Sequence, residues 1–325
     1  MAITFLATGC GGESGKLTVY SGREEEIVGP LLEDFTSTTG IDIEVRYGDS
    51  AELAATLVEE GGASPADVFF AQDAGSLGAT AAEGRLDDVP RPALERVDAR
   101  FRDPAGKWVG TSGRVRVVAY NTDALQEDDV PDSILDFTDP RWKRKIGLPP
   151  TNSSFQAMVT AMSLSLDEER TRGWLEGIKR NEPRFYEKNT PVLEALARGE
   201  IEVGFVNHYY LAILKAEQPD APVANRFMQP RDPGALVNVA GVGIVAGTDD
   251  RTEAEQFVEF LLSDAGQRFY AERAEEAEYP LVAGIDPKPG LPPLESLQGP
   301  NVSLGDFGRE LERTLRLLNE TGFTP

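Results

Sequence analysis

The first part of the chain alternates between two hydrophobic periods, and this alternation limits the fold more than any other feature of the sequence. Ile27, Leu31 and Phe35 recur at helical spacing, whereas apolar and charged side chains alternate strictly across residues 41–47, as in a half-buried strand. Strands are expected at residues 17–20, 41–47 and 67–70, and helices at residues 24–35 and 50–57, the second capped by Ser50. This order predicts a largely parallel sheet covered by helices, in which ligands bind beyond the carboxyl ends of the strands.

The second half of the chain continues the alternation without an obvious repeat. Apolar runs predict strands at residues 115–120, 203–206 and 242–246, and helical spacing predicts helices at residues 154–166, 168–179, 192–198, 252–270 and 307–318. A chain of 325 residues is long enough for two lobes, each with its own core. We therefore predict an α/β protein whose two lobes face each other across a cleft.

Charge and cysteine content exclude several classes of function. The chain has 32 Lys and Arg against 55 Asp and Glu, a net charge of -23, which repels nucleic acids and anionic lipid headgroups. With one Cys and one His in the whole chain, an internal disulfide, a Cys-based zinc cluster and a Cys/His catalytic pair are all excluded. A Gly-rich phosphate loop of the Walker type is also absent from the sequence.

The amino-terminal segment has the features of a lipid attachment site. A short apolar run precedes Ala7-Thr8-Gly9-Cys10, which resembles the lipobox of bacterial lipoproteins, although Ala7 replaces the usual leucine and no basic residues come before the run. Cys10 would carry the lipid, and residues 1–15 would form a signal remnant and a flexible tether. We expect an extracytoplasmic protein that is lipid-anchored or periplasmic and touches the membrane only through this anchor.

Two adjacent tyrosines, Tyr209 and Tyr210, occupy the junction between the apolar run at 203–206 and a helix-like run at 211–216. Neighbouring side chains on a regular strand point to opposite faces, so the pair can converge on one object only where the backbone leaves strand geometry. Phenolate oxygen is a hard anionic donor that suits ferric iron. The alternative is that both rings are packed in a core or stacked on an organic ligand.

Five stretches of the chain, taken in order, form a specific pattern: residues 17–23 (LTVYSGR), 64–70 (SPADVFF), 112–114 (SGR), 135–142 (LDFTDPRW) and 206–210 (VNHYY). This pattern resembles the ferric-ion-binding proteins of bacterial ABC importers, which have the type II periplasmic-binding-protein fold. The resemblance covers nearly the whole chain after the amino-terminal segment. The resemblance implies a first lobe of residues 16–115 plus about 240–285, and a second lobe of residues 116–239 plus about 286–325.

The resemblance also implies a set of metal ligands. Tyr209 and Tyr210 match the two iron-binding phenolates of the family, and Glu24 stands where several members have a histidine ligand. Glu24 also belongs to an acidic first helical turn, where the helix dipole favours carboxylates whether or not they bind a metal. Gln72, a neutral and weaker donor, stands where such members have a glutamate ligand. The open alternatives for this fourth ligand are Asp73, one residue later, a water molecule, or the anion. His208 is expected to be structural.

The family completes its site with a synergistic anion, which is phosphate in some members and carbonate in others. Free backbone N–H groups at a helix start suit an anion, although the same residues can form a plain helix cap. Phosphate is favoured because this chain has serine where the carbonate-binding members have a third tyrosine. The implied anion-binding residues are Ser153, Ser154, Phe155, Asn189, Asn207 and Asp73, with Arg114 or Arg116 balancing the charge.

These observations predict the substrate-binding protein of an ABC importer, a monomer that binds Fe3+ between its lobes, delivers it to a membrane permease and catalyses no reaction. Two rivals remain. The first is a receptor for an organic or phosphonate-type anion on the same fold, which the loss of the usual histidine and glutamate favours. The second is an enzyme that uses the tyrosine pair as an acid and a base, for which the sequence offers no Cys or His nucleophile set.

Overall fold

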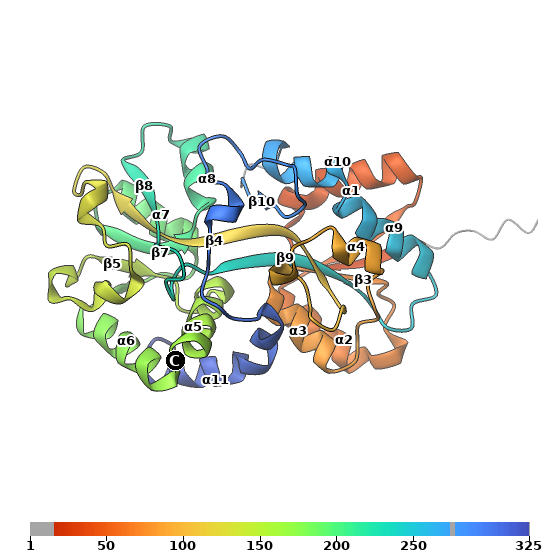
Figure 1. The fold of residues 1–325 in the computed structure, drawn as a ribbon, viewed down its shortest axis with the longest axis horizontal. Coiled ribbons are helices and arrows are strands. Elements are labelled where there is room, and N and C mark those ends of the chain that lie inside the picture. Colours follow the sequence, from red (N-terminus) through yellow and green to blue (C-terminus); the bar gives the residue numbers. More distant parts are fainter. Residues whose placement is uncertain (1–15, 274–276, 325) are drawn as a thin grey trace, which may run out of the picture.

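The computed structural model describes residues 16–273 and 277–324, which form two lobes joined by long strands (Figure 1). The strands are β1 (Leu17–Ser21), β2 (Ile43–Tyr47), β3 (Val68–Ala71), β4 (Val109–Asn121), β5 (Ile146–Leu148), β6 (Arg184–Phe185), β7 (Val203–Asn207), β8 (Val223–Phe227), β9 (Val237–Ile244) and β10 (Tyr279–Pro280). The helices are α1 (Glu25–Thr39), α2 (Ser50–Glu60), α3 (Ala74–Ala82), α4 (Arg91–Glu95), α5 (Ser153–Ser165), α6 (Glu168–Arg180), α7 (Asn189–Ala197), α8 (Tyr210–Glu217), α9 (Arg251–Leu261), α10 (Asp264–Arg268) and α11 (Phe307–Glu320).

The strands follow the order β2-β1-β3-β9-β4-β7-β5-β6, with β8 and β10 also paired to β4. Pairing is parallel among β1, β2 and β3 in the first lobe and among β5, β6 and β7 in the second. It is antiparallel wherever β4 or β9 takes part. The expectation of a largely parallel sheet therefore holds within each lobe but is wrong for the strands that join the lobes.

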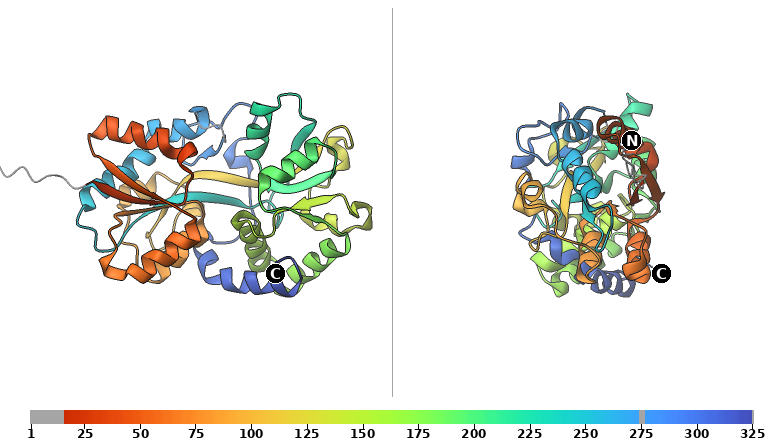
Figure 2. Two further views of the ribbon diagram at one scale, coloured as in Figure 1. Left: turned by 180° about the vertical axis from the view of Figure 1, so that it is seen from behind. Right: turned by 90° about the vertical axis from the view of Figure 1, so that its right-hand side faces the viewer.

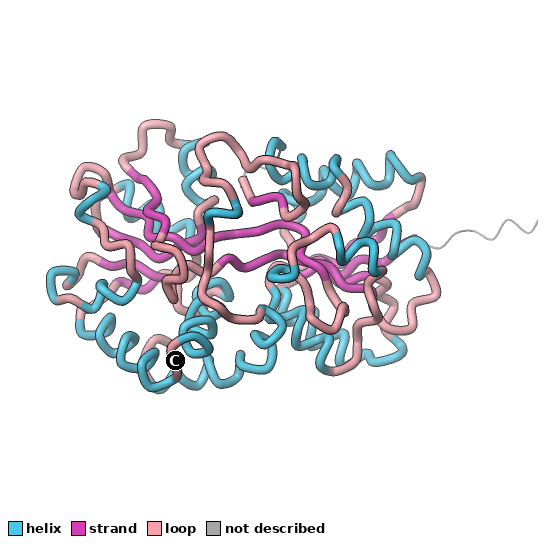
Figure 3. The backbone as a smooth tube through the Cα atoms, viewed as in Figure 1, coloured by secondary structure: helices cyan, strands magenta, loops and turns pink. Residues whose placement is uncertain are grey.

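Strand β4 belongs to both lobes. Its first half pairs with β9 as far as Val115, and its second half, from Arg116, pairs with β7 and β8. Figures 2 and 3 show β4 and β9 running through the middle of the molecule from one lobe to the other, with helices on both sides of the central strands. This change of partner falls between Val115 and Arg116, where the sequence predicted the first boundary between the lobes, and the lobe boundaries stay a prediction.

The sequence predicted only the second half of β4, because the first half contains two glycines and several polar residues. A Cβ on Gly110 would lie 2.7 Å from the carbonyl oxygen of Phe101, and one on Gly113 would lie 3.0 Å from Leu281. Glycine is required here for close packing of the backbone, although glycine weakens a strand pattern in the sequence. Tertiary contacts thus extend the strand beyond its local signal.

Two helix predictions need correction. The helix expected at residues 252–270 is divided into α9, α10 and a π-helical turn at Phe269–Arg273, because the Oγ atom of Ser263 accepts from the amide of Gly266 and caps a new helix. Helix α2 is capped by Asp49, whose carboxylate accepts from the amides of Ala51 and Glu52, and not by Ser50. The hydroxyl of Ser50 instead accepts from the amide of Gln72 at 2.9 Å.

Each lobe has an aromatic core. In the first lobe Phe35 packs edge-on against Phe257, with ring centroids 5.1 Å apart. In the second lobe Phe205 packs against Phe137 at 5.2 Å and against Trp174 at 6.1 Å. Packing in these cores holds the sheet of each lobe in place. The loops at the carboxyl ends of the strands are therefore held in place as well.

Helix α11 contacts both lobes along one edge of the molecule (Figure 1). A Cβ on Gly308 would lie 2.8 Å from the carbonyl oxygen of Gly75 in α3, and the hydroxyls of Thr314 and Thr160 in α5 are 2.7 Å apart. Within residues 16–273 and 277–324, we find no helix with the length and apolar character needed to cross a membrane.

Candidate metal-binding cleft

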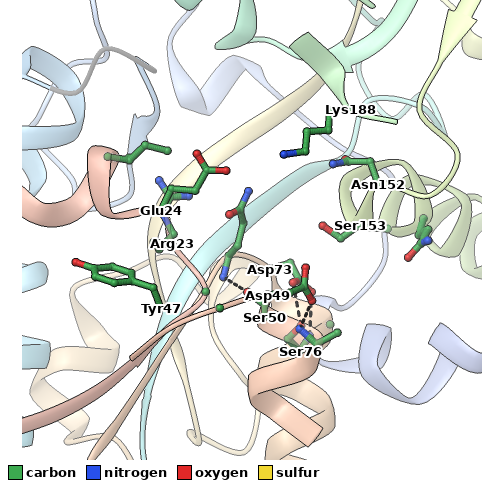
Figure 4. Close-up of a pocket in the computed structure, with 18 of the residues that line it drawn as sticks. Arg23, Glu24, Tyr47, Asp49, Ser50, Asp73, Ser76, Asn152, Ser153 and Lys188 are labelled. Atoms are coloured by element: carbon green, nitrogen blue, oxygen red, sulfur yellow. Dashed lines mark hydrogen bonds between the residues drawn. The ribbon is translucent and has the colours of Figure 1, made fainter. Parts of the chain in front are cut away.

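A cleft of about 1160 Å³ lies between the lobes. Its walls are the loops after β1, β2 and β3 in the first lobe and the first turns of α5, α7 and α8 in the second, with α11 closing one side. Figure 4 shows polar side chains from both lobes projecting into it. The cleft therefore lies where the sequence predicted a ligand, beyond the carboxyl ends of the strands.

The two tyrosines lie in a strand-to-helix turn, as the sequence predicted. Strand β7 ends at Asn207, Tyr209 has backbone angles of -71° and -22°, and α8 begins at Tyr210. The two rings are stacked, with centroids 4.4 Å apart and an angle of 30° between their planes. Tyr209 is buried, while Tyr210 is half-buried and lines the cleft. The turn thus directs two neighbouring phenols to the same side of the backbone.

A buried guanidinium lies beside the tyrosine pair. Arg116 faces Asn207 across β4 and β7, and it donates to the Oδ1 atom of Asn207 at 3.1 Å and to the carbonyl oxygen of Phe205 at 2.6 Å. Burial lowers the pKa of Arg116 to about 10, and the proximity of Tyr209 and Tyr210 opposes this shift. Even so, Arg116 is charged at neutral pH, and a cation in this position stabilises a phenolate.

The predicted anion region forms one hydrogen-bonded group in the second lobe. Asn207 donates to the Oγ atom of Ser154 at 3.0 Å. The Oδ1 atom of Asn152 accepts from the Ser154 amide at 3.1 Å and from the Nδ2 atom of Asn189 at 3.2 Å. Ser153 lines the cleft, whereas Ser154, Asn189 and Asn207 are buried behind it.

Phe155 does not contribute a side chain to the cleft. Its ring is buried and stacks on Phe323 at 6.3 Å, and its amide donates to the carbonyl oxygen of Asn152 at 3.0 Å. Phe155 therefore belongs to the core of the second lobe in this structure. Asn152, which is not among the predicted site residues, caps α5 and lines the cleft.

Glu24 is the candidate ligand of the first lobe. It precedes α1 in an extended conformation, is exposed, and makes no side-chain bond to the helix start that it precedes. In Figure 4 its carboxylate projects into the cleft from one side and the amine of Lys188 projects from the other. A carboxylate in this place is accessible to a cation held by the opposite lobe.

Gln72 and Asp73 both make hydrogen bonds within the first lobe. With the Gln72 amide oriented so that both of its groups are satisfied, Nε2 donates to the carbonyl oxygen of Gly22 at 3.1 Å, and Oε1 accepts from Arg114 at 3.2 Å. Asp73 caps α3, since its carboxylate accepts from the amide and the hydroxyl of Ser76 at 2.9 and 3.0 Å. In this arrangement both side chains support the cleft wall.

A buried ionic cluster behind the first-lobe wall was not found in the sequence. Glu278 accepts from Arg23 through both carboxylate oxygens, at 3.1 and 3.0 Å, and from the hydroxyl of Ser112 at 2.6 Å. Arg114 lies 3.7 Å from the same carboxylate. Burial alone would raise the pKa of Glu278, but the charges of Arg23 and Arg114 hold it below its usual value. Arg114 is thus engaged with Glu278 and Gln72, and Arg116 is the arginine beside the predicted anion region.

His208 makes two hydrogen bonds and lies outside the cleft lining, in agreement with its predicted structural role. Its Nδ1 atom accepts from the amide of Val115 at 3.2 Å, so Nε2 carries the proton and donates to the carbonyl oxygen of Ala277 at 3.0 Å. Burial lowers the pKa of His208 to about 4. The ring is therefore neutral at physiological pH and fixes the turn that carries the tyrosines.

The described part of the chain contains no group of three or more His, Cys, Asp or Glu side chains arranged to hold a metal. A metal site in this cleft would depend on the phenols, with Glu24 supplied from the opposite lobe. Such a divided donor set is typical of sites that are completed when two lobes close.

Comparisons with known proteins agree on one class. Residues 63–297 match a family described as bacterial extracellular solute-binding protein. The major ferric iron-binding protein of Neisseria meningitidis serogroup B is 35% identical over 310 residues, which cover 94% of this chain and 92% of that protein. Iron uptake protein A1 of Synechocystis is 30% identical over 321 residues, covering 96% of this chain and 88% of that protein.

Solved structures give the same result. Iron-bound HitA from Pseudomonas aeruginosa superposes with a TM-score of 0.88 at 32% identity, covering 94% of this chain and 99% of that one. Trichodesmium FutA, in complex with iron and citrate ligands, superposes with a TM-score of 0.85 at 28% identity, covering 95% and 100% of the two chains. The two-lobed arrangement is that of the type II periplasmic binding proteins.

Proposed function

This chain belongs to the bacterial extracellular solute-binding proteins, and from that premise we propose that it binds ferric iron in the cleft between its lobes. Members of the family bind solutes for transport, so the protein is a binding protein and not an enzyme. The observation that carries the proposal is the stacked pair of Tyr209 and Tyr210, of which Tyr210 lines the cleft, beside the buried charge of Arg116. The names of the relatives, which are iron-binding and iron-uptake proteins, support the same cargo.

The proposed ligands are the phenolates of Tyr209 and Tyr210 and the carboxylate of Glu24. Their charges sum to three negative units, which neutralise Fe3+, and all three donors are hard oxygens of the kind that this ion prefers. Arg116 offsets the cost of ionising two adjacent phenols before the metal arrives. We assign Gln72 and Asp73 to support of the cleft wall, because their polar atoms bind Arg114, Gly22 and Ser76.

A synergistic anion would complete the coordination from the second lobe. The start of α5 presents Ser153 and its hydroxyl to the cleft, and the buried Asn189 and Asn207 lie behind it. Arg116 balances the negative charge that the anion adds. We propose phosphate in preference to carbonate, since hydroxyl and amide donors occupy this wall and a third phenol is absent from the described residues that line the cleft near α5.

Delivery of the ion would require a membrane permease, towards which the monomeric protein would present both lobes in their closed state. Cys10 lies outside the described residues, and we retain lipid attachment through it as a proposal. Replacing Cys10 with serine should move the protein from the membrane fraction to the soluble fraction of the cells that make it. An unchanged distribution would rule out the anchor.

Adding ferric citrate to the apo protein, with and without phosphate, tests the proposed function. A broad visible absorption band is expected from phenolate-to-iron charge transfer, and it should vanish in the Tyr209→Phe/Tyr210→Phe variant. The matched control is Tyr120→Phe, which alters a buried tyrosine of the second lobe outside the cleft lining. Dependence of the band on phosphate identifies the anion.

The second candidate is a receptor for an organic or phosphonate-type anion. One observation favours it: the amide of Gln72, at the position where iron-binding relatives are expected to have a glutamate ligand, is bonded to Arg114 and not offered to a metal. The absence of any visible band with either anion, at iron concentrations far above micromolar, would make this receptor the better description.

A further inference from the structure

One short segment of the first lobe contacts the turns that carry both sets of proposed ligands. The carbonyl oxygen of Ala277 accepts from His208, which precedes Tyr209 in the sequence. The carboxylate of Glu278 accepts from Arg23, which precedes Glu24. Each contact is thus made one residue away from a proposed ligand, and the two ligands come from opposite lobes.

The same segment is fixed to the strand that joins the lobes. Tyr279 pairs with Gly113 of β4, and the hydroxyl of Ser112 donates to Glu278 at 2.6 Å. Ala277 adopts a positive φ of 51°, a left-handed conformation that is unfavourable for alanine and persists only where surrounding contacts enforce it. The segment is therefore held in one conformation against β4.

Glu278 and Arg23 form a rigid connection. The side chains of both residues are only 1% exposed, and the guanidinium meets the carboxylate through two parallel hydrogen bonds, at 3.1 and 3.0 Å. Paired, charge-assisted bonds in a buried environment fix both distance and orientation. Glu278 itself is not among the residues that line the cleft, so it acts on the cleft only through its partners.

The turn before Glu24 is held at further points. Arg114, 3.7 Å from Glu278, donates to Gln72, and Gln72 in turn donates to the carbonyl oxygen of Gly22. The amide of Gly22 donates to the carbonyl oxygen of Phe70 at 2.8 Å. Glu24 is therefore an exposed carboxylate at the end of a turn whose preceding residues are fixed from behind, as the positions of Arg23 and Glu24 in Figure 4 illustrate.

We propose that Glu278 is a positioning residue for the ferric site, which sets the place of the Glu24 carboxylate through Arg23. The adjoining Ala277 carbonyl holds His208, so the same segment also keeps the tyrosine turn in register with β4. This inference rests on the proposed function, because it requires Glu24 to bind the metal that the tyrosines hold.

The test compares Glu278→Gln with Glu24→Gln and with the double variant. Ferric affinity is measured by competition with citrate, and the visible spectrum of each iron complex is recorded. We expect Glu278→Gln to weaken binding by about tenfold, to keep the tyrosine band, and to shift that band as Glu24→Gln does. The double variant should lose no more than Glu24→Gln alone. Additive losses, or an unshifted band in Glu278→Gln, would overturn the proposal.

Two further variants allow for misfolding, because Glu278→Gln leaves buried arginines without their counter-charge. Glu278→Asp keeps the charge and should restore part of the affinity, and Arg23→Lys removes the paired hydrogen bonds while keeping its own charge. If Glu278→Gln does not fold, the proposal is tested with Arg23→Lys, which should reproduce the band shift of Glu24→Gln. An unshifted band in Arg23→Lys would overturn the proposal. The matched control is Glu60→Gln, which removes another Arg–Glu pair of the first lobe, 3.3 Å long and outside the cleft lining, and should bind iron as the wild type does.

The controls separate this inference from the proposed function. If the wild-type protein gives no tyrosine-dependent band, ferric binding itself fails. If the wild type gives the band but Glu24→Gln binds iron unchanged, the tyrosine assignment stands and the role of Glu278 is refuted.

Discussion

The two walls of the cleft are built in opposite ways. In the second lobe Arg116 is buried, is hydrogen-bonded to Asn207, and lies beside the stacked pair of Tyr209 and Tyr210, which carries the proposed ligands. In the first lobe the proposed ligand, Glu24, is exposed, and the buried charges lie behind it around Glu278. Under the proposed function, we expect the second lobe to bind the ion first and most tightly, and the first lobe to add a ligand when the lobes close.

The largest effect is expected from removing the second-lobe donors. Tyr209→Phe/Tyr210→Phe should reduce ferric affinity by at least about a thousandfold, because two anionic ligands are lost at once. Glu24→Gln should cost only about tenfold, because one ligand is lost from the wall that completes the site. Isothermal titration with ferric citrate measures both. Equal losses in the two variants would contradict the division between the walls.

Acidification should weaken the support of the tyrosine turn. The unfolded chain protonates His208 below about pH 6.5, whereas the folded protein does not do so until its pKa of about 4. The folded state therefore binds fewer protons in this window, and the free energy of unfolding should fall by about 3 kcal/mol as the pH drops through it.

Urea unfolding of the apo protein between pH 7 and 4 measures this loss. His208→Gln serves as the comparison, since its slope over the same window should be flatter. The stabilising effect of Glu278 is lost only at lower pH. Its depressed pKa means that the carboxylate keeps its charge until the pH falls below the usual range of a glutamate. An identical slope in His208→Gln would show that the buried histidine is not the group that titrates.

Arg116→Gln should weaken ferric binding by roughly tenfold to a hundredfold, since the phenols then lose the nearby positive charge that favours their ionised form. Arg116→Lys keeps the charge and should lose less. Competition with citrate at fixed pH gives both values. If the two variants behave alike, hydrogen bonding to Asn207 and Phe205 matters more than charge.

The smallest effect is expected at Gln72. Gln72→Leu removes its two hydrogen bonds to Arg114 and Gly22 and should lower ferric affinity only about fivefold, comparable to the net worth of one hydrogen bond. The visible band should shift less than in Glu278→Gln, because Gln72 is assigned no contact with the ion and reaches the Glu24 turn only through the Gly22 carbonyl. A shift larger than that of Glu24→Gln would make Gln72 a ligand, so that the first-lobe wall would then supply two ligands.

Local sequence patterns predicted much of this arrangement. The strict alternation of apolar and charged residues predicted β2, and helical spacing predicted α1 and α11. The junction at Tyr209 and Tyr210 predicted the strand-to-helix turn on which the proposed site depends. These features follow from contacts between residues that are near in sequence, and for that reason a single sequence contains them.

The parts that were missed depend on residues far apart in the chain. Arg23 and Glu278 are separated by 255 positions, and nothing in either neighbourhood marks them as partners. The glycines of β4 read as breaks in a strand, although close packing against Phe101 and Leu281 requires them. Similarly, Asp49 and Ser50 are both good helix caps, and they are distinguished by a long-range contact, in which the Gln72 amide donates to the Ser50 hydroxyl.

Strand β4 has a consequence for how the molecule unfolds. All of its residues, from Val109 to Asn121, are buried, and it is a central strand of the sheets in both lobes. Neither lobe can lose its sheet without removing a strand from the other, so heat or denaturant should disrupt both lobes in a single cooperative transition. The amide hydrogens of β4 should then exchange with solvent only through that global opening, and more slowly than those of any helix end.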